Sequence, residues 1–331
     1  MKKTQKSVNH VQKSLFSQIE EILPKQVIAA HEIADILSLS TDSVYRRMRG
    51  EKKLSIDEIC KLCEHFDISV DALLNRKQNS VSFETVPFYG EELNNFFSHL
   101  ETLGKTLHRY HSEKNNNILY LAAEIPFINL ASFEELATFK LYGWSNSLYD
   151  YTGNYSSFCS QVKGDRLFQS YREISNLYKE IPSIEIWHPG TFDAYLSWIH
   201  FFYETGSFEN KEMAIELCSQ LLQFTNELQR NVENSRKEGK SEKNLSFYIS
   251  DIALENNFMI IKADKLQDSY VKLFSSNGMI VHDKKYCEET EKWFLKLQKK
   301  SKLISGSSQK ERHQYFQIIK NKIAQTSEKI R

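Results

Sequence analysis

The part of this chain that most constrains its fold is residues 31–75, which read HEIADILSLSTDSVYRRMRGEKKLSIDEICKLCEHFDISVDALLN. Apolar residues recur there at intervals of three and four, and short polar corners separate the repeats, which predicts several short amphipathic helices. Upstream, residues 11–23 show the same spacing and end at Pro24, which cannot continue a helix. We therefore expect the N-terminal quarter of the chain to be a small bundle of helices.

The helix boundaries in this bundle are signalled by capping residues. A second helix is predicted over 27–37, and Ser40 or Thr41 is placed to cap a third helix over 42–49. Gly50 can close that third helix in the left-handed conformation. Ser55 and Glu58 have the spacing of a capping box, which opens a fourth helix, and a short fifth helix follows residue 69.

The third helix has two chemically different faces. Val44 and Met48 lie four residues apart and are expected to face inward. The outward positions are then left to polar and charged side chains, namely Asp42, Ser43, Arg46 and Arg49. A short helix with a capped start and a basic exit is typical of the recognition helix of a helix-turn-helix, which enters the major groove of DNA.

The order and spacing of these elements resemble the lambda/Cro repressor-like helix-turn-helix family. EIADILSLS is similar to the family's second helix and turn, TDSVYRRMRGEK to its recognition helix, and KLSIDEICKLCEHFDISVDALL to its closing helices. Two positions depart from the pattern: Ser38 stands where the turn usually has glycine, and Arg47 where an apolar residue is common. The general layout also resembles BetR-type regulators, in which such a domain precedes a long uncharacterised region.

The resemblance implies specific contacts with double-stranded DNA. Thr41, Asp42 and Arg46 are expected to meet base edges, with Arg46 bonding guanine in a bidentate manner. Phosphate contacts are expected from four residues around the helix start and exit: Ser40, Arg49, Lys52 and Lys53. The alternative for the same residues is a solvated charged helix in a small protein-binding module.

Composition limits how such binding can work. The chain has 331 residues and balanced charge, with 43 Lys and Arg against 43 Asp and Glu. Residues 1–80 carry 13 basic and 11 acidic side chains, so a DNA footprint must be local and centred on the arginines and lysines of residues 46–53. No apolar run is long enough for a membrane span or a signal peptide, and five scattered cysteines do not form a disulfide framework, so we expect a cytoplasmic protein.

Two cysteines, Cys60 and Cys63, form a C-x-x-C motif, which raises the alternatives of zinc binding and redox chemistry. Both fall within the predicted fourth helix, and no second pair of Cys or His ligands follows. We therefore interpret them as core residues and predict no metal site and no cofactor.

The remainder of the chain is predicted to be mainly α. We assign residues 1–76 to a five-helix repressor-like domain, 77–85 to a linker and 86–331 to a larger helical region. Helices are expected over 91–109, 133–149, 164–178, 191–203, 213–232, 284–299 and 309–326. A small antiparallel sheet is expected near residues 245–282, from β-rich runs at 245–253, 257–263, 269–275 and 279–282, whereas residues 118–130 fit a strand, a buried helix or both.

Clusters of aromatic residues stand out in this larger region. Tyr142, Trp144 and Tyr155 belong to one cluster, and Trp187 and Tyr195 to another. They are interpreted as core or as a dimer interface, with an effector pocket as the alternative. No polar catalytic cluster, glycine-rich phosphate loop or self-cleavage site is evident, so no enzyme is expected.

These observations favour a sequence-specific DNA-binding transcriptional regulator. Its C-terminal region would serve for dimerisation and for sensing a small-molecule or protein effector. The alternative is a protein-interaction scaffold, or a regulator of another protein, that uses the helical C-terminal region.

Overall fold

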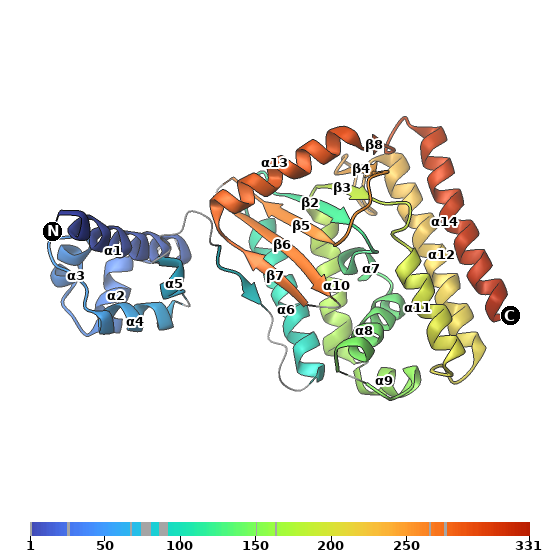
Figure 1. The fold of residues 1–331 in the computed structure, drawn as a ribbon, viewed down its shortest axis with the longest axis horizontal. Helices are drawn as coiled ribbons and strands as arrows, with labels where there is room; N and C mark the ends of the chain where they lie inside the picture. Colours follow the sequence, from blue (N-terminus) through green and yellow to red (C-terminus); the bar gives the residue numbers. More distant parts are fainter. Residues whose placement is uncertain are drawn as a thin grey trace. The chain divides into compact units, whose positions relative to one another are not determined.

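A computed structural model describes residues 2–24, 27–66, 68–73, 81–85, 92–149, 151–162, 164–264, 266–274 and 277–331. The chain forms two compact units, Met1–Ser82 and Phe83–Arg331. The trace of each unit can be followed by colour in Figure 1. None of the helices in these ranges is both long and apolar enough to cross a membrane.

The described residues of the first unit form only helices and the loops between them. It contains α1 (Lys2–Ile22), α2 (Ala29–Leu37), α3 (Thr41–Met48), α4 (Ile56–His65) and α5 (Val70–Leu73). Its core is a single apolar cluster to which all five helices contribute: Leu15, Phe16, Ile19, Ala30, Ile33, Ala34, Leu37, Val44, Leu54, Leu62, Cys63, Ile68 and Leu73. The small Ala30 and Ala34 on α2 leave room for neighbouring helices to pack closely.

Local capping explains the helix boundaries of this unit. Ser40 is the N-cap of α3 and accepts a hydrogen bond from the backbone N–H of Ser43. Gly50 has φ 76°, the left-handed conformation expected after α3. Ser55 and Glu58 form the predicted capping box at the start of α4. The first helix is longer than expected, since α1 begins at residue 2 and not at 11, and α2 begins at residue 29 and not at 27.

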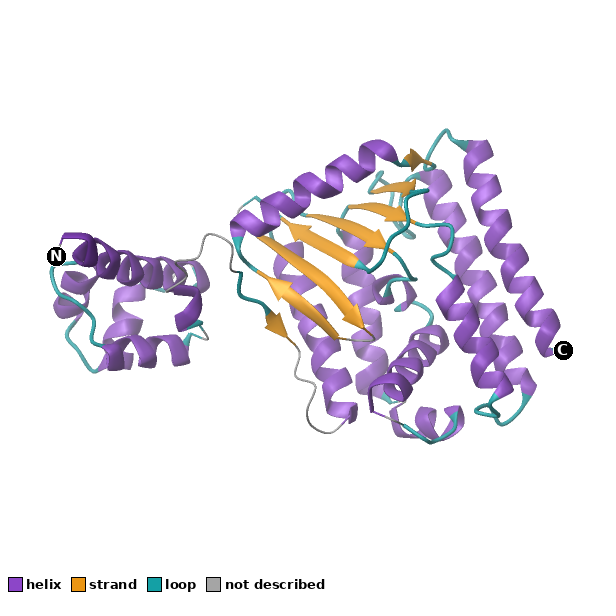
Figure 2. Ribbon diagram, viewed as in Figure 1, coloured by secondary structure: helices purple, strands orange, loops and turns teal. Residues whose placement is uncertain are grey.

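The second unit is built around one sheet, drawn in orange in Figure 2. The sheet has eight strands in the order β1-β7-β6-β5-β2-β3-β4-β8. The strands are β1 (Glu84–Thr85), β2 (Asn117–Ala122), β3 (Ser183–Trp187), β4 (Leu245–Ile249), β5 (Phe258–Lys262), β6 (Gln267–Phe274), β7 (Asn277–Val281) and β8 (Lys302–Leu303). β2, β3 and β4 run parallel to one another, and every other neighbouring pair is antiparallel.

The prediction of a small antiparallel sheet at residues 245–282 is therefore wrong in extent and in topology. Only β5, β6 and β7 form the expected antiparallel run, whereas β4 pairs in parallel with β3. Long helical crossovers separate β2, β3 and β4 in the sequence, so their pairing leaves no local turn signal to detect. Glu84–Thr85, within the predicted linker 77–85, pair with β7 as β1, and most of the remaining linker lies outside the described residues.

Helices cover both faces of the sheet. They are α6 (Glu92–His111), α7 (Phe127–Leu130), α8 (Glu134–Tyr149), α9 (Tyr155–Val162), α10 (Asp165–Glu180), α11 (Asp193–Glu204), α12 (Lys211–Asn234), α13 (Lys284–Lys300) and α14 (Gln309–Ile330). Phe294 and Leu297 of α13 pack on one face, against Leu119, Leu121 and Ile260. Helices α6 to α12 and α14 lie on the opposite face (Figure 1). Their side chains and those of the sheet form a much larger core there.

The ambiguous segment 118–130 contains both of its alternatives. β2 ends at Ala122, and Pro126 is the N-cap of the short helix α7. β3 and α9 were not predicted. β3 is five residues long, and its polar and apolar residues alternate over only four positions, 183–186, which is too short a run to stand out between the two long helical patterns on either side.

Candidate nucleic-acid interface

The link between α2 and α3 has the geometry of a helix-turn-helix. Ser38 ends α2 with φ 54° and ψ 46°, the left-handed region, and Leu39 donates a backbone hydrogen bond to the carbonyl of Ala34. Ser40 then caps α3. A left-handed residue at this turn explains why glycine is usual there, because other side chains pay about 1 kcal/mol for that conformation.

The two faces of α3 differ sharply in exposure. Val44 is fully buried and Arg47 is 3% exposed, so both point into the unit. Asp42, Tyr45 and Arg46 are exposed on the other side. The outward face therefore presents a carboxylate, a phenol and a guanidinium within little more than one turn of helix, a surface suited to base edges.

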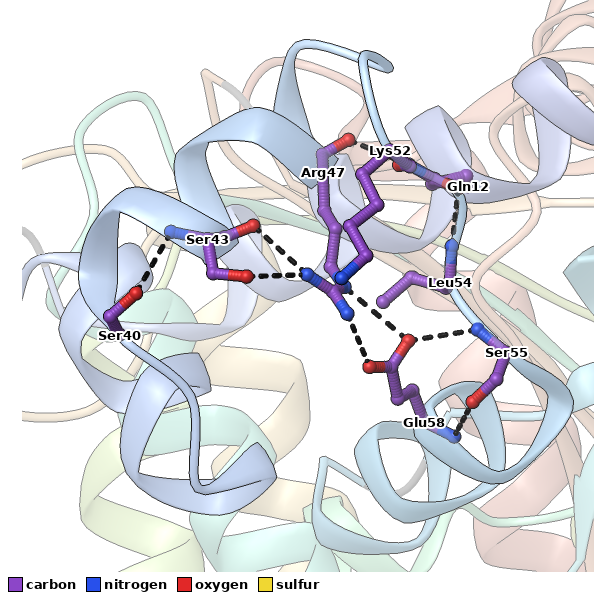
Figure 3. Close-up of polar contacts among 8 residues, drawn as sticks. All are labelled: Gln12, Ser40, Ser43, Arg47, Lys52, Leu54, Ser55 and Glu58. Atoms are coloured by element: carbon purple, nitrogen blue, oxygen red, sulfur yellow. Dashed lines mark hydrogen bonds and ion pairs between the residues drawn. The ribbon is translucent and has the colours of Figure 1, made fainter.

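Arg47 is held in the interior by four hydrogen bonds from its guanidinium group (Figure 3). Its guanidinium donates to both carboxylate oxygens of Glu58, from Nη2 at 2.6 Å and from Nε at 3.3 Å. Nη1 donates to the hydroxyl and the backbone carbonyl of Ser43 at 2.7 and 3.2 Å. An arginine at this usually apolar position is accommodated because its charge is paired in a bidentate manner.

The pKa of the Glu58 carboxyl reflects its hydrogen bonds in this arrangement. Burial alone would raise the pKa of its carboxyl, but the hydrogen bonds from Arg47 and from the Ser55 backbone N–H outweigh that effect, and the pKa is lowered. Glu58 thus closes the capping box of α4 and neutralises Arg47 at once. This pair joins α3 to α4.

A buried glutamine fixes the segment that leaves α3. Gln12 of α1, 4% exposed, donates from Nε2 to the carbonyls of Arg47 and Lys52 at 2.6 and 2.8 Å. Its Oε1 accepts from the backbone N–H of Leu54 at 3.0 Å (Figure 3). One side chain therefore sets the path of the loop that carries the predicted phosphate-binding lysines.

The predicted DNA-contacting residues all lie within positions 40–53, and each of them is at least partly exposed in the structure. Thr41 is partly exposed and Asp42 and Arg46 are exposed, as base reading requires. The residues expected to meet phosphates, Ser40, Arg49, Lys52 and Lys53, are all exposed as well. None of these seven side chains is buried in the core.

Glu51 lies among these cations. Its carboxylate is 3.6 Å from Arg46 Nε and 2.7 Å from Arg49 Nε. The hydrogen bond from Arg49 is the main reason why the pKa of Glu51 is lowered. DNA phosphates would have to compete with this carboxylate for both arginines, although exposed pairs of this kind are weak.

Sequence reasoning missed three residues of this surface. Tyr45, 41% exposed, was not assigned a role, although its position one residue before Arg46 and three after Asp42 puts it on the outward face. Gln12 and Glu51 were also missed. Glu51 could have been noticed from its place between Arg49 and Lys52, whereas the contacts of Gln12 join positions 35 to 42 residues apart.

The C-x-x-C motif divides between the surface and the core of α4. Cys63 is 5% exposed and packs in the core, where burial raises the pKa of its thiol, but Cys60 is exposed. The interpretation of both as core residues is therefore right for Cys63 and wrong for Cys60. Within the described ranges, no group of three or more His, Cys, Asp and Glu side chains is arranged to hold a metal.

The aromatic clusters of the second unit are core. Tyr142, Tyr155, Trp187 and Tyr195 are each at most 3% exposed and belong to its large apolar cluster. Trp144 belongs to the same cluster but also lines a cavity.

Comparison with known proteins bears on the first unit. Residues 13–94 match the BetR domain, a helix-turn-helix type of DNA-binding domain, and they make up about a quarter of the chain. No curated protein and no solved structure matches the chain. The match supports DNA binding with a regulatory role.

Proposed function

We propose that this protein is a sequence-specific transcriptional regulator that reads double-stranded DNA in the major groove with α3. The observation that carries the proposal is that α3 has a buried face and an exposed face. Val44 and Arg47 are buried in the unit, whereas Asp42, Tyr45 and Arg46 are exposed to solvent. The turn at Ser38 and the BetR match support a DNA-binding role for this helix.

In the proposed complex, Arg46 donates two hydrogen bonds to one guanine, and Thr41 and Asp42 contact neighbouring base edges. Tyr45 supplies an apolar ring edge for a thymine methyl group. Ser40, Arg49, Lys52 and Lys53 meet phosphates and set the register of the helix.

We further propose that the regulator acts as a homodimer in the cytoplasm, with the second unit providing dimerisation and effector sensing. A single module of this size buries only ~600–1,000 Å² of protein surface on DNA. Two copies on half-sites about one helical turn apart gain both affinity and specificity.

Binding of the full chain to genomic fragments, followed by fluorescence anisotropy at several salt concentrations, tests this proposal. Arg46→Ala should reduce the preference for the selected site by about 1–3 kcal/mol. Lys52→Ala should weaken binding to all sequences and lower the salt slope by about one. Lys61→Ala, which removes an exposed lysine of α4, serves as the charge-matched control and should leave both quantities unchanged.

Equal, salt-insensitive binding by both variants and the wild type would overturn the DNA assignment. It would favour the alternative, in which the helical region is a scaffold that regulates another protein.

A further inference from the structure

The second unit contains a cavity of about 120 Å³ between its sheet and helices α6, α7 and α8. Strands β2, β5, β6 and β7 form the other wall. β2 is the strand at which the sheet changes from parallel pairing with β3 to antiparallel pairing with β5, and Glu124 follows directly after its carboxyl end. Ligands of α/β sheets commonly bind outside the carboxyl ends of strands where the strand arrangement switches.

Two lysines from different elements face this cavity. Lys140 of α8 is 2% exposed and donates a 2.5 Å hydrogen bond to the carbonyl of Ile125. Lys272 of β6 is 20% exposed and forms an ion pair with Glu124. The same carboxylate oxygen of Glu124 lies 3.6 Å from Lys140 Nζ, so one carboxylate is shared between two ammonium groups.

The cavity therefore has an excess of positive charge when both lysines are protonated. Glu124 is the one acidic residue among the described side chains that line it. Nearby His99 of α6 adds no charge near neutral pH, because burial, reinforced by Lys272, lowers the pKa of its imidazole to about 4. In that state one positive charge has no counter-charge among the described lining residues, in surroundings where such a charge is costly.

Trp144 adds a second, independent sign of a ligand. Its ring centroid lies 5.6 Å from Lys140 Nζ and 5.1 Å from Lys272 Nζ, and the His99 ring packs against it edge to face. The residue is 2% exposed, yet its indole N–H is buried without a hydrogen-bond partner in the described part of the chain. Buried polar groups rarely go unpaired, and this one belongs to a residue that lines the cavity.

The rest of the lining is mainly apolar. Leu103, Met259 and Ile280 face the cavity from α6 and from two strands. A cavity of ~150 Å³ with such a lining accommodates benzene, so this one fits a body of about six heavy atoms.

We propose that this cavity binds a small organic carboxylate with a compact apolar or aromatic body. The carboxylate supplies the missing negative charge between Lys140 and Lys272 and accepts a hydrogen bond from Trp144 Nε1. The apolar body fills the space lined by Leu103, Met259 and Ile280. An effector role for this ligand rests on the proposed function, whereas its binding to the cavity does not.

Isothermal titration calorimetry of the full chain with benzoate tests the proposal, with benzamide as the neutral analogue of nearly the same shape. Benzoate should bind at least tenfold more tightly than benzamide, because only benzoate supplies the negative charge. Lys272→Met should lower benzoate affinity at least tenfold and leave benzamide binding unchanged, which also shows that the cavity is intact. Lys262→Met is the matched control, since Lys262 lies on adjacent β5 and pairs with Glu291 of α13.

A pH series on the unaltered chain gives a test that requires no variant. Burial lowers the pKa of both Lys140 and Lys272 to about 7, whereas it raises the pKa of Tyr120 and Tyr270 and keeps these phenols neutral. Benzoate stays ionised above pH 6. Its affinity should therefore fall about tenfold between pH 6 and pH 8.5, while benzamide affinity stays constant.

The proposal is overturned if benzoate does not bind at millimolar concentration, if benzamide binds equally well, or if Lys272→Met binds benzoate as the wild type does. All titrations are done without DNA. If the chain binds benzoate but not DNA, only the regulator function is refuted. If it binds DNA but not benzoate, only the cavity assignment is refuted.

Discussion

The two units of this protein each bury a charged cluster, but they match the charges to different degrees. In the first unit, Arg47 is paired with Glu58 and also bonded to Ser43, so each of the three nitrogen atoms of its buried guanidinium group donates to an acceptor. In the second unit, Lys140 and Lys272 share the single carboxylate of Glu124 beside a cavity. The comparison separates a cluster that holds structure together from one that is suited to receive a ligand.

The largest expected effect comes from breaking the matched cluster. Glu58→Gln leaves the buried Arg47 charge without its counter-ion, which should destabilise the first unit by about 2–3 kcal/mol. Hydrogen exchange of the α3 amides in the full chain measures this loss. Glu64→Gln, at an exposed site on the same helix, should leave exchange unchanged.

The pH dependence of the same cluster follows from the lowered pKa of Glu58. A carboxyl whose pKa is lower in the folded state contributes stability above its unfolded pKa of about 4.3, and this contribution is lost as the pH falls through the folded value. Circular dichroism on acid titration should show helix loss in that range. Glu58→Gln, having lost this titratable group, should show a smaller change.

Removing one lysine from the unmatched cluster of Lys140, Lys272 and Glu124 should stabilise the protein. Lys272→Met removes a buried cation whose pKa is lowered by burial and leaves Glu124 with Lys140 as its one partner. We expect the second unit to gain about 1 kcal/mol at pH 7, measured by chemical denaturation followed by tryptophan fluorescence. A loss of more than 1 kcal/mol would mean that Lys272 is a structural residue like Arg47.

A smaller change in stability is expected at a feature that the two units share, a helix that ends in a left-handed serine. Ser38 ends α2 and Ser235 ends α12, both in the left-handed conformation, with φ 54° and 53°. Ser38→Gly and Ser235→Gly should each stabilise their own unit by ~0.5–1 kcal/mol, because glycine adopts this conformation without strain. Ser55→Ala is the contrasting change, since it removes a cap at φ −74° and should destabilise the first unit by about 1 kcal/mol.

The smallest effect concerns DNA affinity. Glu51→Gln frees Arg46 and Arg49 from a competing carboxylate, so affinity should rise by a factor of about two to five at low salt. The gain should be similar for specific and random sequences and should shrink as salt is added. Anisotropy titrations at two salt concentrations distinguish this from a change in base reading.

Local signals predicted much of the molecule. The caps at Ser40 and Ser55, the turn glycine at residue 50 and the apolar spacing placed α3, α4 and most long helices of the second unit near their observed positions. The exposure of Asp42, Arg46 and the basic exit followed from the same periodicity. All of these features depend on residues within a few positions of each other.

What the sequence by itself determined is the set of helices in the first unit and the outward-facing residues of α3, because capping and helical periodicity act over one to three turns. Only the tertiary structure decided the parallel pairing of β2, β3 and β4, the ion pair that allows Arg47 to be buried, and the meeting of Lys140, Lys272 and Glu124 at one cavity. These features join residues 11 to about 150 positions apart. Such contacts arise from packing, which no local pattern encodes.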